Sequence, residues 1–437
     1  MTPAAIVPPA SLVPMSSLPA PAHPDLRAAA ISVEEHRATI LDAVRPLPAV
    51  SVALAEAAGR TLARDARAAV DAPPFDSSAM DGFAVRSADV DAATSTSPAR
   101  LRVVADLPAG ATADPALGPG EAARIMTGAP VPTAADAIVP FEDTAGGLAD
   151  SLSEISVLAP PRAVGAHIRR RGEEGRLGDV IVPAGTCLGP MQLAALASAG
   201  VDRIAVAARP RIVVVSTGSE LVPAGSPLRR GQIAESNAAM IGGLATQAGA
   251  VVVRAVHVDD DGAALAALLH DISTNTDHID AVVFTGGVSA GAYEVVRTTV
   301  RPMSFGPVAM QPGRPQGFGV ATLADGRSTL LFGLPGSPAG AAVSFEVFVR
   351  PALLALQGRA PHDRAVLRMR AAEGWRAARG RRQYRAVTVD RTDPAKWSAA
   401  PVAPGAVRLG AVDGYAIVPP DVDVVAPDDL VDVVLIG

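Results

Sequence analysis

The feature that most constrains this 437-residue chain is a regular alternation of strand and helix patterns between residues 207 and 357. Apolar, β-branched runs predict strands at 212–215, 251–258, 281–284 and 329–332. Helical patterns follow at 238–247, at 263–272 and from Pro338 onward. Strands that alternate with helices imply a mostly parallel sheet with helices on both faces. We therefore expect an α/β domain over residues 207–357.

Three loops that follow predicted strands of this domain share a glycine-rich design. They span residues 216–220 (STGSE), 285–291 (TGGVSAG) and 334–338 (LPGSP). In open α/β sheets, ligands bind at the carboxyl edge of the strands. Glycine lets backbone approach a ligand closely, and N–H groups at a helix start favour an anion. One such loop is more typical of a tight turn, but three on one edge predict a phosphate-bearing ligand.

Other features exclude alternative classes. Neither G-x-G-x-x-G nor G-x-x-x-x-G-K-[ST] occurs in a strand–loop–helix setting, which argues against a dinucleotide fold and a P-loop. The net charge of −6 argues against a nucleic-acid binder. The single cysteine, Cys187, fits a reducing cytosol. No secretory signal is visible, and Pro335, Pro338 and Glu346 interrupt the most apolar stretch, so we expect no membrane span and a cytoplasmic protein.

The remaining chain divides by composition and pattern. Ser32 and Glu35 have capping-box spacing, which predicts that the first helix begins there. Short β patterns after the α/β domain indicate a small barrel or sandwich. The expected divisions are a flexible tail (1–31), an elongated helical linker domain (32–70 and 165–206), an inserted β module (71–164), the α/β domain (207–357) and a C-terminal β domain (358–437).

Acidic residues near the same predicted edge are candidates for metal binding. The run 259–261 lies between a strand and a helix, and two roles stay open for it. It is suited to cap the helix from Ala263, or to coordinate Mg²⁺, because a hard ion that bridges phosphates takes carboxylate oxygens. Glu220 and Glu294 are further carboxylates at this edge, although either one alone is typical of a solvated surface.

Several motifs in a fixed order resemble the MoeA family, which includes the E domain of gephyrin. The most specific are residues 74–85 (PFDSSAMDGFAV) and 124–132 (RIMTGAPVP). Shorter matches follow at 168–173, 183–185, 216–218, 220–221, 231–233, 236–237, 286–289, 312–313 and 335–338. The resemblance spans about residues 32 to 437.

The resemblance implies an α/β molybdopterin-binding domain, an inserted β module, an elongated helical linker region and a C-terminal β-barrel. It also implies a homodimer whose active site lies between the α/β domain of one subunit and the β module of the other. The implied reaction inserts molybdenum from molybdate into adenylated molybdopterin, releases AMP and uses Mg²⁺. A non-catalytic relative that binds pterin, or that acts as a scaffold in contact with molybdoenzymes or cofactor carriers, stays an alternative.

The resemblance also assigns residues by position. The implied catalytic residues are Asp81, Thr127, Asp260, Glu294 and Arg314. The implied Mg²⁺ ligands are Asp260, Glu294 and Glu220. The implied pterin-binding residues are Ser216, Thr217, Gly218, Ser219, Glu220, Asn237, Gly286, Gly287, Val288, Ser289, Pro312, Gly313, Pro335, Gly336, Ser337 and Pro338.

Some positions depart from the family pattern. Pro307 and Gln311 stand where many relatives carry lysine, while Arg314 keeps one cation. These departures affect the expected molybdate subsite more than the pterin subsite, and they leave molybdate use open. The candidates for compensating charge are Arg297, Arg314, Arg382 and Arg385. Glutamate replaces the aspartate common in relatives at Glu174, Glu235 and Glu294.

Overall fold

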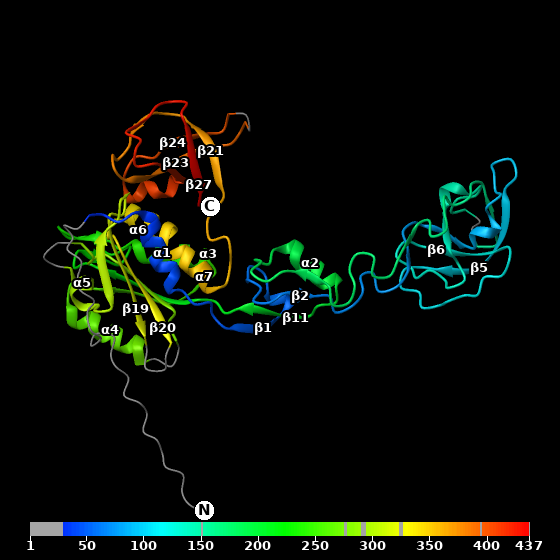
Figure 1. Cartoon of the computed structure of the whole chain (residues 1–437), viewed down its shortest axis with the longest axis horizontal. Coiled ribbons are helices and arrows are strands. Elements are labelled where there is room, and N and C mark those ends of the chain that lie inside the picture. The colour runs from blue at the N-terminus through cyan, green and yellow to red at the C-terminus, as the bar shows by residue number, and fades with distance from the viewer. Residues whose placement is uncertain are drawn as a thin grey trace, which may run out of the picture.

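The computed structural model describes residues 29–149, 152–274, 278–289, 294–322, 327–393 and 396–436. Figure 1 shows an extended molecule with the α/β domain and the C-terminal domain packed together at one end. A narrow middle region leads to the β module at the other end. Most of the expected tail, residues 1–28, lies outside the described residues.

The α/β domain is built on a six-stranded sheet in the order β15-β12-β16-β20-β19-β17. These strands span Val251–Val258, Arg211–Thr217, Ala281–Thr285, Ser328–Leu334, Pro315–Thr322 and Met303–Pro307. The first four are parallel, as predicted, whereas β19 pairs antiparallel with both neighbours. The sequence did not predict β19, because its glycines break the strand pattern. A Cβ on Gly319 would lie 2.2 Å from the Pro302 carbonyl oxygen, so close strand packing requires glycine there.

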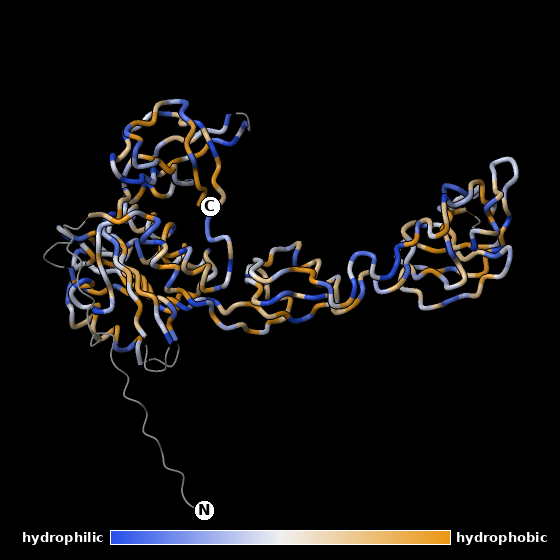
Figure 2. Tube along the Cα trace, in the orientation of Figure 1, coloured by the Kyte–Doolittle hydropathy of each residue, from blue (hydrophilic) through white to orange (hydrophobic). Residues whose placement is uncertain are grey.

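Helices cover both faces of this sheet, which explains why its central strands are apolar throughout. Ile212 and Val214 of β12 face one core, while Val213 and Val215 face a second core on the opposite side. The covering elements are α3 (Asn237–Gln247), α4 (Gly262–Thr274), α5 (Val295–Thr299), α6 (Pro338–Ser344), the π-helical turn η5 (Phe345–Val349) and α7 (Arg350–Leu356). Figure 2 shows apolar segments concentrated in the strands of this central sheet.

Among the described residues, one helical stretch, Pro338–Leu356, is long and apolar enough to span a membrane by length and composition. The structure buries 72% of the most apolar 18-residue segment of this stretch inside the molecule. Such burial is what a core helix of a folded domain shows.

The first helix differs from its expected placement. α1 (Val33–Ala43) begins with the predicted capping box, in which the Glu35 amide donates to Ser32 Oγ and the Glu35 carboxylate accepts from the Ser32 amide. Its apolar face, with Val33 and Ile40, packs into the α/β core. Residues 33–44 therefore lie on the α/β domain and not in the linker that we expected. An amphipathic pattern shows that a face is buried but does not show which domain covers it.

The middle region contains less helix than expected. Two antiparallel pairs run along it, β1 with β11 and β2 with β10. These strands span Ala49–Ala53, Arg203–Ala207, Ala66–Arg67 and Val180–Val182. Between residues 48 and 70 and between 165 and 207, which the structure describes fully, α2 (Pro190–Ser198) is the only α-helix. The small core of this middle region includes Leu62, Val182, Leu196 and Val206.

The β module contains a five-stranded sheet in the order β7-β4-β6-β5-β8. Its strands span Ala137–Pro140, Gly82–Val85, Glu121–Ile125, Ala99–Leu107 and Glu154–Val157. The chain enters and leaves side by side, because β3 (Ser77–Ser78) pairs with β9 (Ile168–Arg169). Arg170 pairs with Asp76 and Arg171 with Asp71 at this neck, each at 2.6 Å. The module is therefore an insertion in the middle region.

The C-terminal domain is a closed barrel, which settles the choice between barrel and sandwich. Five strands follow one another in the order β23-β24-β21-β27-β25, and β25 pairs with β23 to close the circle. They span Arg382–Asp390, Ser398–Pro401, Val366–Ala371, Leu430–Leu435 and Gly414–Val418. β18 (Met310–Gln311) of the α/β domain pairs with β23 and so joins the two domains.

Candidate functional site

The loops after β12 and β15 are bonded to each other at the carboxyl edge of the sheet. The Ser219 amide and hydroxyl both donate to Asp260 Oδ2, at 3.0 and 2.9 Å. Asp261 instead accepts from the Ala263 amide at 2.9 Å, in the first turn of α4. The structure thus gives the capping role to Asp261, while Asp260 lies exposed at the edge.

Beneath this edge lies a chain of buried and partly buried hydrogen bonds. Thr285 Oγ1 donates to Ser216 Oγ at 3.3 Å, and Ser216 Oγ donates to Glu235 Oε1 at 2.9 Å. The same Glu235 oxygen accepts from the Ala238 amide at 2.9 Å. Ser216 is fully buried, so its hydroxyl holds the ends of β12 and β16 against the start of α3. We expected this hydroxyl to face a ligand, but in the structure it connects buried parts of the domain beneath the edge.

The second and third glycine-rich loops pack directly against each other. A Cβ on Gly336 would lie 3.4 Å from the Gly286 Cα, and a Cβ on Gly286 would lie 2.6 Å from the Thr217 carbonyl oxygen. Asn237 Nδ2 donates to the Gly336 carbonyl at 2.8 Å, while its buried Oδ1 has no partner within the described part of the chain. The three loops therefore form one continuous surface at one edge of the sheet.

The end of the second loop is held by the start of α5. The Ser289 amide donates to Glu294 Oε2 at 2.7 Å, and Arg297 Nη1 donates to the Ser289 carbonyl at 3.3 Å. Val288 is buried in the core under α5, so only its backbone is available to a ligand. Residues 290 and 291 of this expected loop lie outside the described residues.

The expected Mg²⁺ ligands lie around this edge without forming a ready-made cage. Within the described ranges, no group of three or more His, Cys, Asp or Glu side chains is suited to hold a metal ion. Asp260 and Glu294 accept the loop hydrogen bonds given above, and Glu220 lies against Gly218. Mg²⁺ often takes one or two carboxylates and completes its shell with water and substrate phosphates. The carboxylates of Asp260, Glu294 and Glu220 fit a Mg²⁺ ion that is bound in this way.

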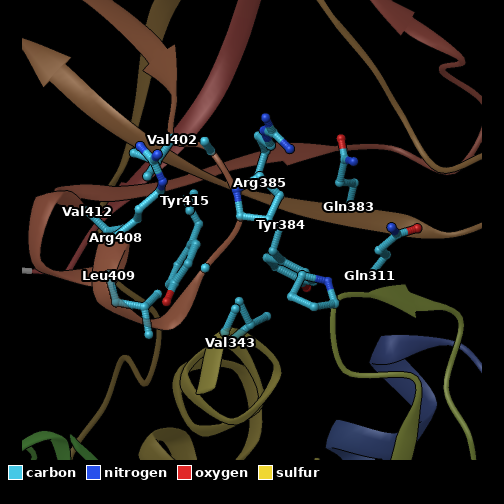
Figure 3. Close-up of a pocket in the computed structure, with 16 residues that line it drawn as sticks. Gln311, Val343, Gln383, Tyr384, Arg385, Val402, Arg408, Leu409, Val412 and Tyr415 are labelled. Carbon is cyan, nitrogen blue, oxygen red and sulfur yellow. The ribbon is translucent and has the colours of Figure 1, made fainter. Parts of the chain in front are cut away.

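Residues of the 307–315 segment line a cavity between the α/β domain and the barrel. Its volume is about 230 Å³, and its walls come from β18, α6, β23, β25 and the 3₁₀ helix η7 (Ala406–Ala411) (Figure 3). Gln311, Pro312, Arg385 and Arg408 are among the lining residues, and Figure 3 shows Arg385 between Gln311 and Arg408. Arg385 Nε is buried without a partner among the described residues. The lining of the cavity thus combines apolar residues with two arginines.

Of the four candidate cations, only Arg385 lines this cavity. Arg382 pairs with Glu34 of α1, and Arg297 bonds to the second glycine-rich loop. Arg314 is exposed at the end of the Pro312-Gly313 turn and is not a wall residue. Sequence reasoning missed Arg408, because nothing in the local pattern places η7 against α6. Gly313 itself is fixed by Gln316, whose side-chain amide donates to its carbonyl at 2.6 Å.

Asp81 and Thr127 form a defined pair in the β module. The Thr127 amide and hydroxyl donate to Asp81 Oδ1 at 2.7 and 2.8 Å. These two bonds lower the pKa of Asp81, which is exposed and therefore ionised at neutral pH. Within one chain the pair lies far from the glycine-rich edge, at the opposite end of the molecule (Figure 1). One chain alone does not bring these expected site residues together.

Comparison with known proteins places the chain in a family. The model of the MoeA N-terminal region (domain I and II) matches residues 31–200, and that of a probable molybdopterin binding domain matches residues 213–355. The Mycobacterium tuberculosis protein named molybdopterin molybdenumtransferase 2 is 40% identical over 409 residues, which cover 90% of this chain and 97% of that protein. The chain belongs to the MoeA family.

Further similarities agree with this MoeA assignment. A Staphylococcus aureus molybdopterin molybdenumtransferase is 35% identical over 327 residues, covering 74% of this chain and 75% of that protein. The solved MoeA structure from Pyrococcus horikoshii OT3 has a TM-score of 0.78 at 26% identity and covers 93% of this chain and 100% of that one. The three glycine-rich loops lie within residues 213–355, so this edge belongs to the part of the chain that matches the probable molybdopterin binding domain.

Proposed function

We propose that this MoeA protein inserts molybdenum from molybdate into adenylated molybdopterin, with release of AMP and with the help of Mg²⁺. The observation that carries the proposal is the joined surface of three loops at the carboxyl edge of the sheet. Its position is the one at which open α/β sheets bind ligands. The names of the relatives supply the substrate class.

The loops suit the phosphates of such a substrate. Gly218, Gly286 and Gly287 all have positive φ angles, and because they lack a Cβ they let a ligand approach the loop backbone closely. The amides of Gly218 and Gly286 donate to the carbonyls of Val258 and Leu334, at 3.3 and 3.1 Å, and so hold the loops in place. Asp260 keeps one carboxylate oxygen outside its bonds to Ser219, so with Glu294 it would hold Mg²⁺ together with the phosphates. Bound Mg²⁺ would neutralise the charge on the phosphates. Glu220 is a further candidate ligand at the rim.

The cavity in Figure 3 is the proposed molybdate subsite. Guanidinium N–H groups match an oxyanion well, and Arg385 and Arg408 provide them on a partly apolar wall. Gln311 adds an amide donor where relatives often carry a lysine, and Arg314 would attract the anion from outside. This arrangement favours a working transferase over the non-catalytic alternative.

We further propose that two chains complete each site. Asp81 and Thr127 lie on the far β module, so they reach a glycine-rich edge only if that edge belongs to a second chain (Figure 1). A symmetric homodimer would repeat this exchange in both directions. Reducing conditions in the cytoplasm would keep the dithiolene of the substrate reduced, and we place the reaction there.

The direct test mixes the purified chain with adenylated molybdopterin, molybdate and Mg²⁺. We expect AMP release together with formation of molybdenum cofactor. Binding of the pterin without AMP release would support the non-catalytic alternative. Absence of pterin binding would contradict the transferase and the pterin-binding form of the alternative.

A further inference from the structure

A charged cluster next to the cavity of Figure 3 is not part of the site proposed above. Glu346 lies at its centre, in the π-helical turn η5, with a side chain only 9% exposed. Arg364 Nε and Nη2 donate to Glu346 Oε1 and Oε2 at 2.7 and 3.2 Å. Arg350 Nη1 lies 3.5 Å from Oε1. Arg364 belongs to the segment that enters the barrel, so this bidentate pair crosses from one domain to the other.

The helix places Glu346 next to the cavity. Pro351 cannot donate a backbone hydrogen bond, and in a regular helix its ring would clash with the carbonyl four residues earlier. The π-helical turn just before it accommodates this proline. Ala339 and Val343 line the cavity, and Glu346 follows three residues later. Leu409, Val412 and Tyr415, which line this cavity, also line a smaller cavity with Glu346, so the wall of the first cavity continues into the charged cluster.

Two barrel tyrosines separate the cavity from the cluster. Tyr384 and Tyr415 line the cavity of Figure 3 and also line a second cavity of about 230 Å³, whose walls include Glu346 and Arg364. Both tyrosines are buried. Burial, and then the negative charge of Glu346, raise the pKa of the Tyr415 hydroxyl. Any movement of the barrel relative to Glu346 therefore moves a wall of the first cavity.

Two more ion pairs cross near the same boundary. Arg37 of α1 pairs with Asp363 at 2.5 Å, next to Arg364, and Glu34 pairs with Arg382 of β23. These outer pairs are partly exposed, so each contributes little alone. Glu346 differs, because its side chain is only 9% exposed and a largely desolvated carboxylate is costly to leave without its partners.

We propose that Glu346 is a positioning residue, which with Arg364 fixes the barrel against the α6–α7 helix and so sets the shape of the oxyanion cavity. This inference rests on the proposed function, because it takes that cavity to be the molybdate subsite. Glu346 does not line the cavity of Figure 3. Its effect must therefore pass through the barrel strands that carry Tyr384, Arg385 and Tyr415.

The test compares the full-length E346Q and R364M variants with D432N. Asp432 pairs with Arg368 at 3.3 Å within the barrel, so its loss breaks an ion pair that does not cross the boundary. For E346Q and R364M we expect the molybdate KM to rise about tenfold, as for coupled residues of one ion-pair network. The kcat at saturating molybdate and the Kd of adenylated molybdopterin should stay within about twofold, and D432N should match the wild type.

A second readout does not depend on activity. Spin labels at Q247C and E373C, two exposed positions on the α/β domain and the barrel, report the distance between the domains in a C187S background. E346Q should broaden the distance distribution, and D432N should not. If E346Q fails to fold, R364M decides both readouts. Wild-type protein without molybdate-dependent turnover contradicts the proposed function, whereas a distribution unchanged in both variants overturns the positioning role. The role is also overturned if KM stays unchanged, or if pterin Kd and molybdate KM rise equally.

Discussion

The glycine-rich edge and the interdomain cavity hold their polar groups in different ways. At the edge, neighbouring loops of one sheet hold one another in place through hydrogen bonds, such as those that Ser219 donates to Asp260. In the cavity, Gln311 comes from the α/β domain, while Arg385 and Arg408 come from the barrel. The edge is therefore preformed by strand ends of one domain, whereas the cavity exists only where two domains pack. This contrast implies that the two proposed subsites can be damaged separately.

The largest expected effect comes from G286A at the edge. An added Cβ would lie 2.6 Å from the Thr217 carbonyl oxygen, so the second loop must move away from the first. A displacement of this kind should weaken binding of adenylated molybdopterin by about 100-fold, measured by calorimetry. Molybdate affinity should stay near the wild-type value.

Gly225 provides the matched control. Its φ of +86° is close to the +87° of Gly286, but a Cβ there would meet nothing within 4 Å. G225A carries the same backbone strain without the collision, so pterin binding should be retained. Equal losses in the two variants would show that strain, and not the close approach of the loops, causes the effect.

Asp260→Asn should have the next largest effect. The substitution keeps the shape of the side chain but removes the charge that we assign to Mg²⁺ and phosphate binding. We expect kcat to fall by about tenfold or more, with a higher Mg²⁺ requirement in a titration of AMP release. Asp259, whose side chain is 71% exposed, is the control, and D259N should behave like the wild type. An unchanged Mg²⁺ requirement in D260N would remove Asp260 from the metal site.

Arg385→Ala tests the other side of the comparison. It removes a guanidinium from the cavity wall and leaves the glycine-rich edge intact. The molybdate KM should rise about tenfold, while the pterin Kd should change by less than about twofold. Arg391 lies exposed just after the same strand, so R391A controls for loss of charge alone. A parallel loss of pterin binding in R385A would contradict separate subsites.

The smallest expected effect concerns Asp81 in the β module and the dependence of activity on pH. Its pKa is lowered by the Thr127 amide and hydroxyl, so the ionised form is favoured in the folded protein. The stability that this provides is present above the unfolded pKa of about 3.9 and is lost as the pH falls through the folded pKa. T127V removes one donor, so the pKa of Asp81 should move up towards its ordinary value. The acid limb of kcat/KM should move to higher pH with it.

Thr133 offers a control with the same chemistry. Its amide and hydroxyl donate to Asp114 at 2.8 Å each and lower the pKa of that carboxyl. T133V should raise the pKa of Asp114 in an NMR titration but leave the activity profile in place. A profile that shifts equally in both variants would argue against a role for Asp81 in the reaction.

The same contrast explains what the sequence could predict. Strands β12, β15, β16 and β20 and the loops after three of them follow from local periodicity and glycine placement, and these build the edge. Arg408 and Glu346 could not be assigned, because their roles depend on how η7 and the α6–α7 helix meet the barrel. The sequence reasoning also placed α1 in the linker, since its apolar face does not identify the domain that it covers. Asp81 could be assigned to the site only from the family resemblance, because no local sequence pattern marks an exposed carboxylate as functional.

The most direct test of this account titrates adenylated molybdopterin and molybdate independently against the wild-type chain, with AMP release as the signal. Two separate subsites for one reaction predict that AMP release requires both substrates and saturates in each. They also predict that the KM for the pterin is nearly the same at low and high molybdate. AMP release that proceeds without molybdate, or no release when both substrates are saturating, would contradict the account.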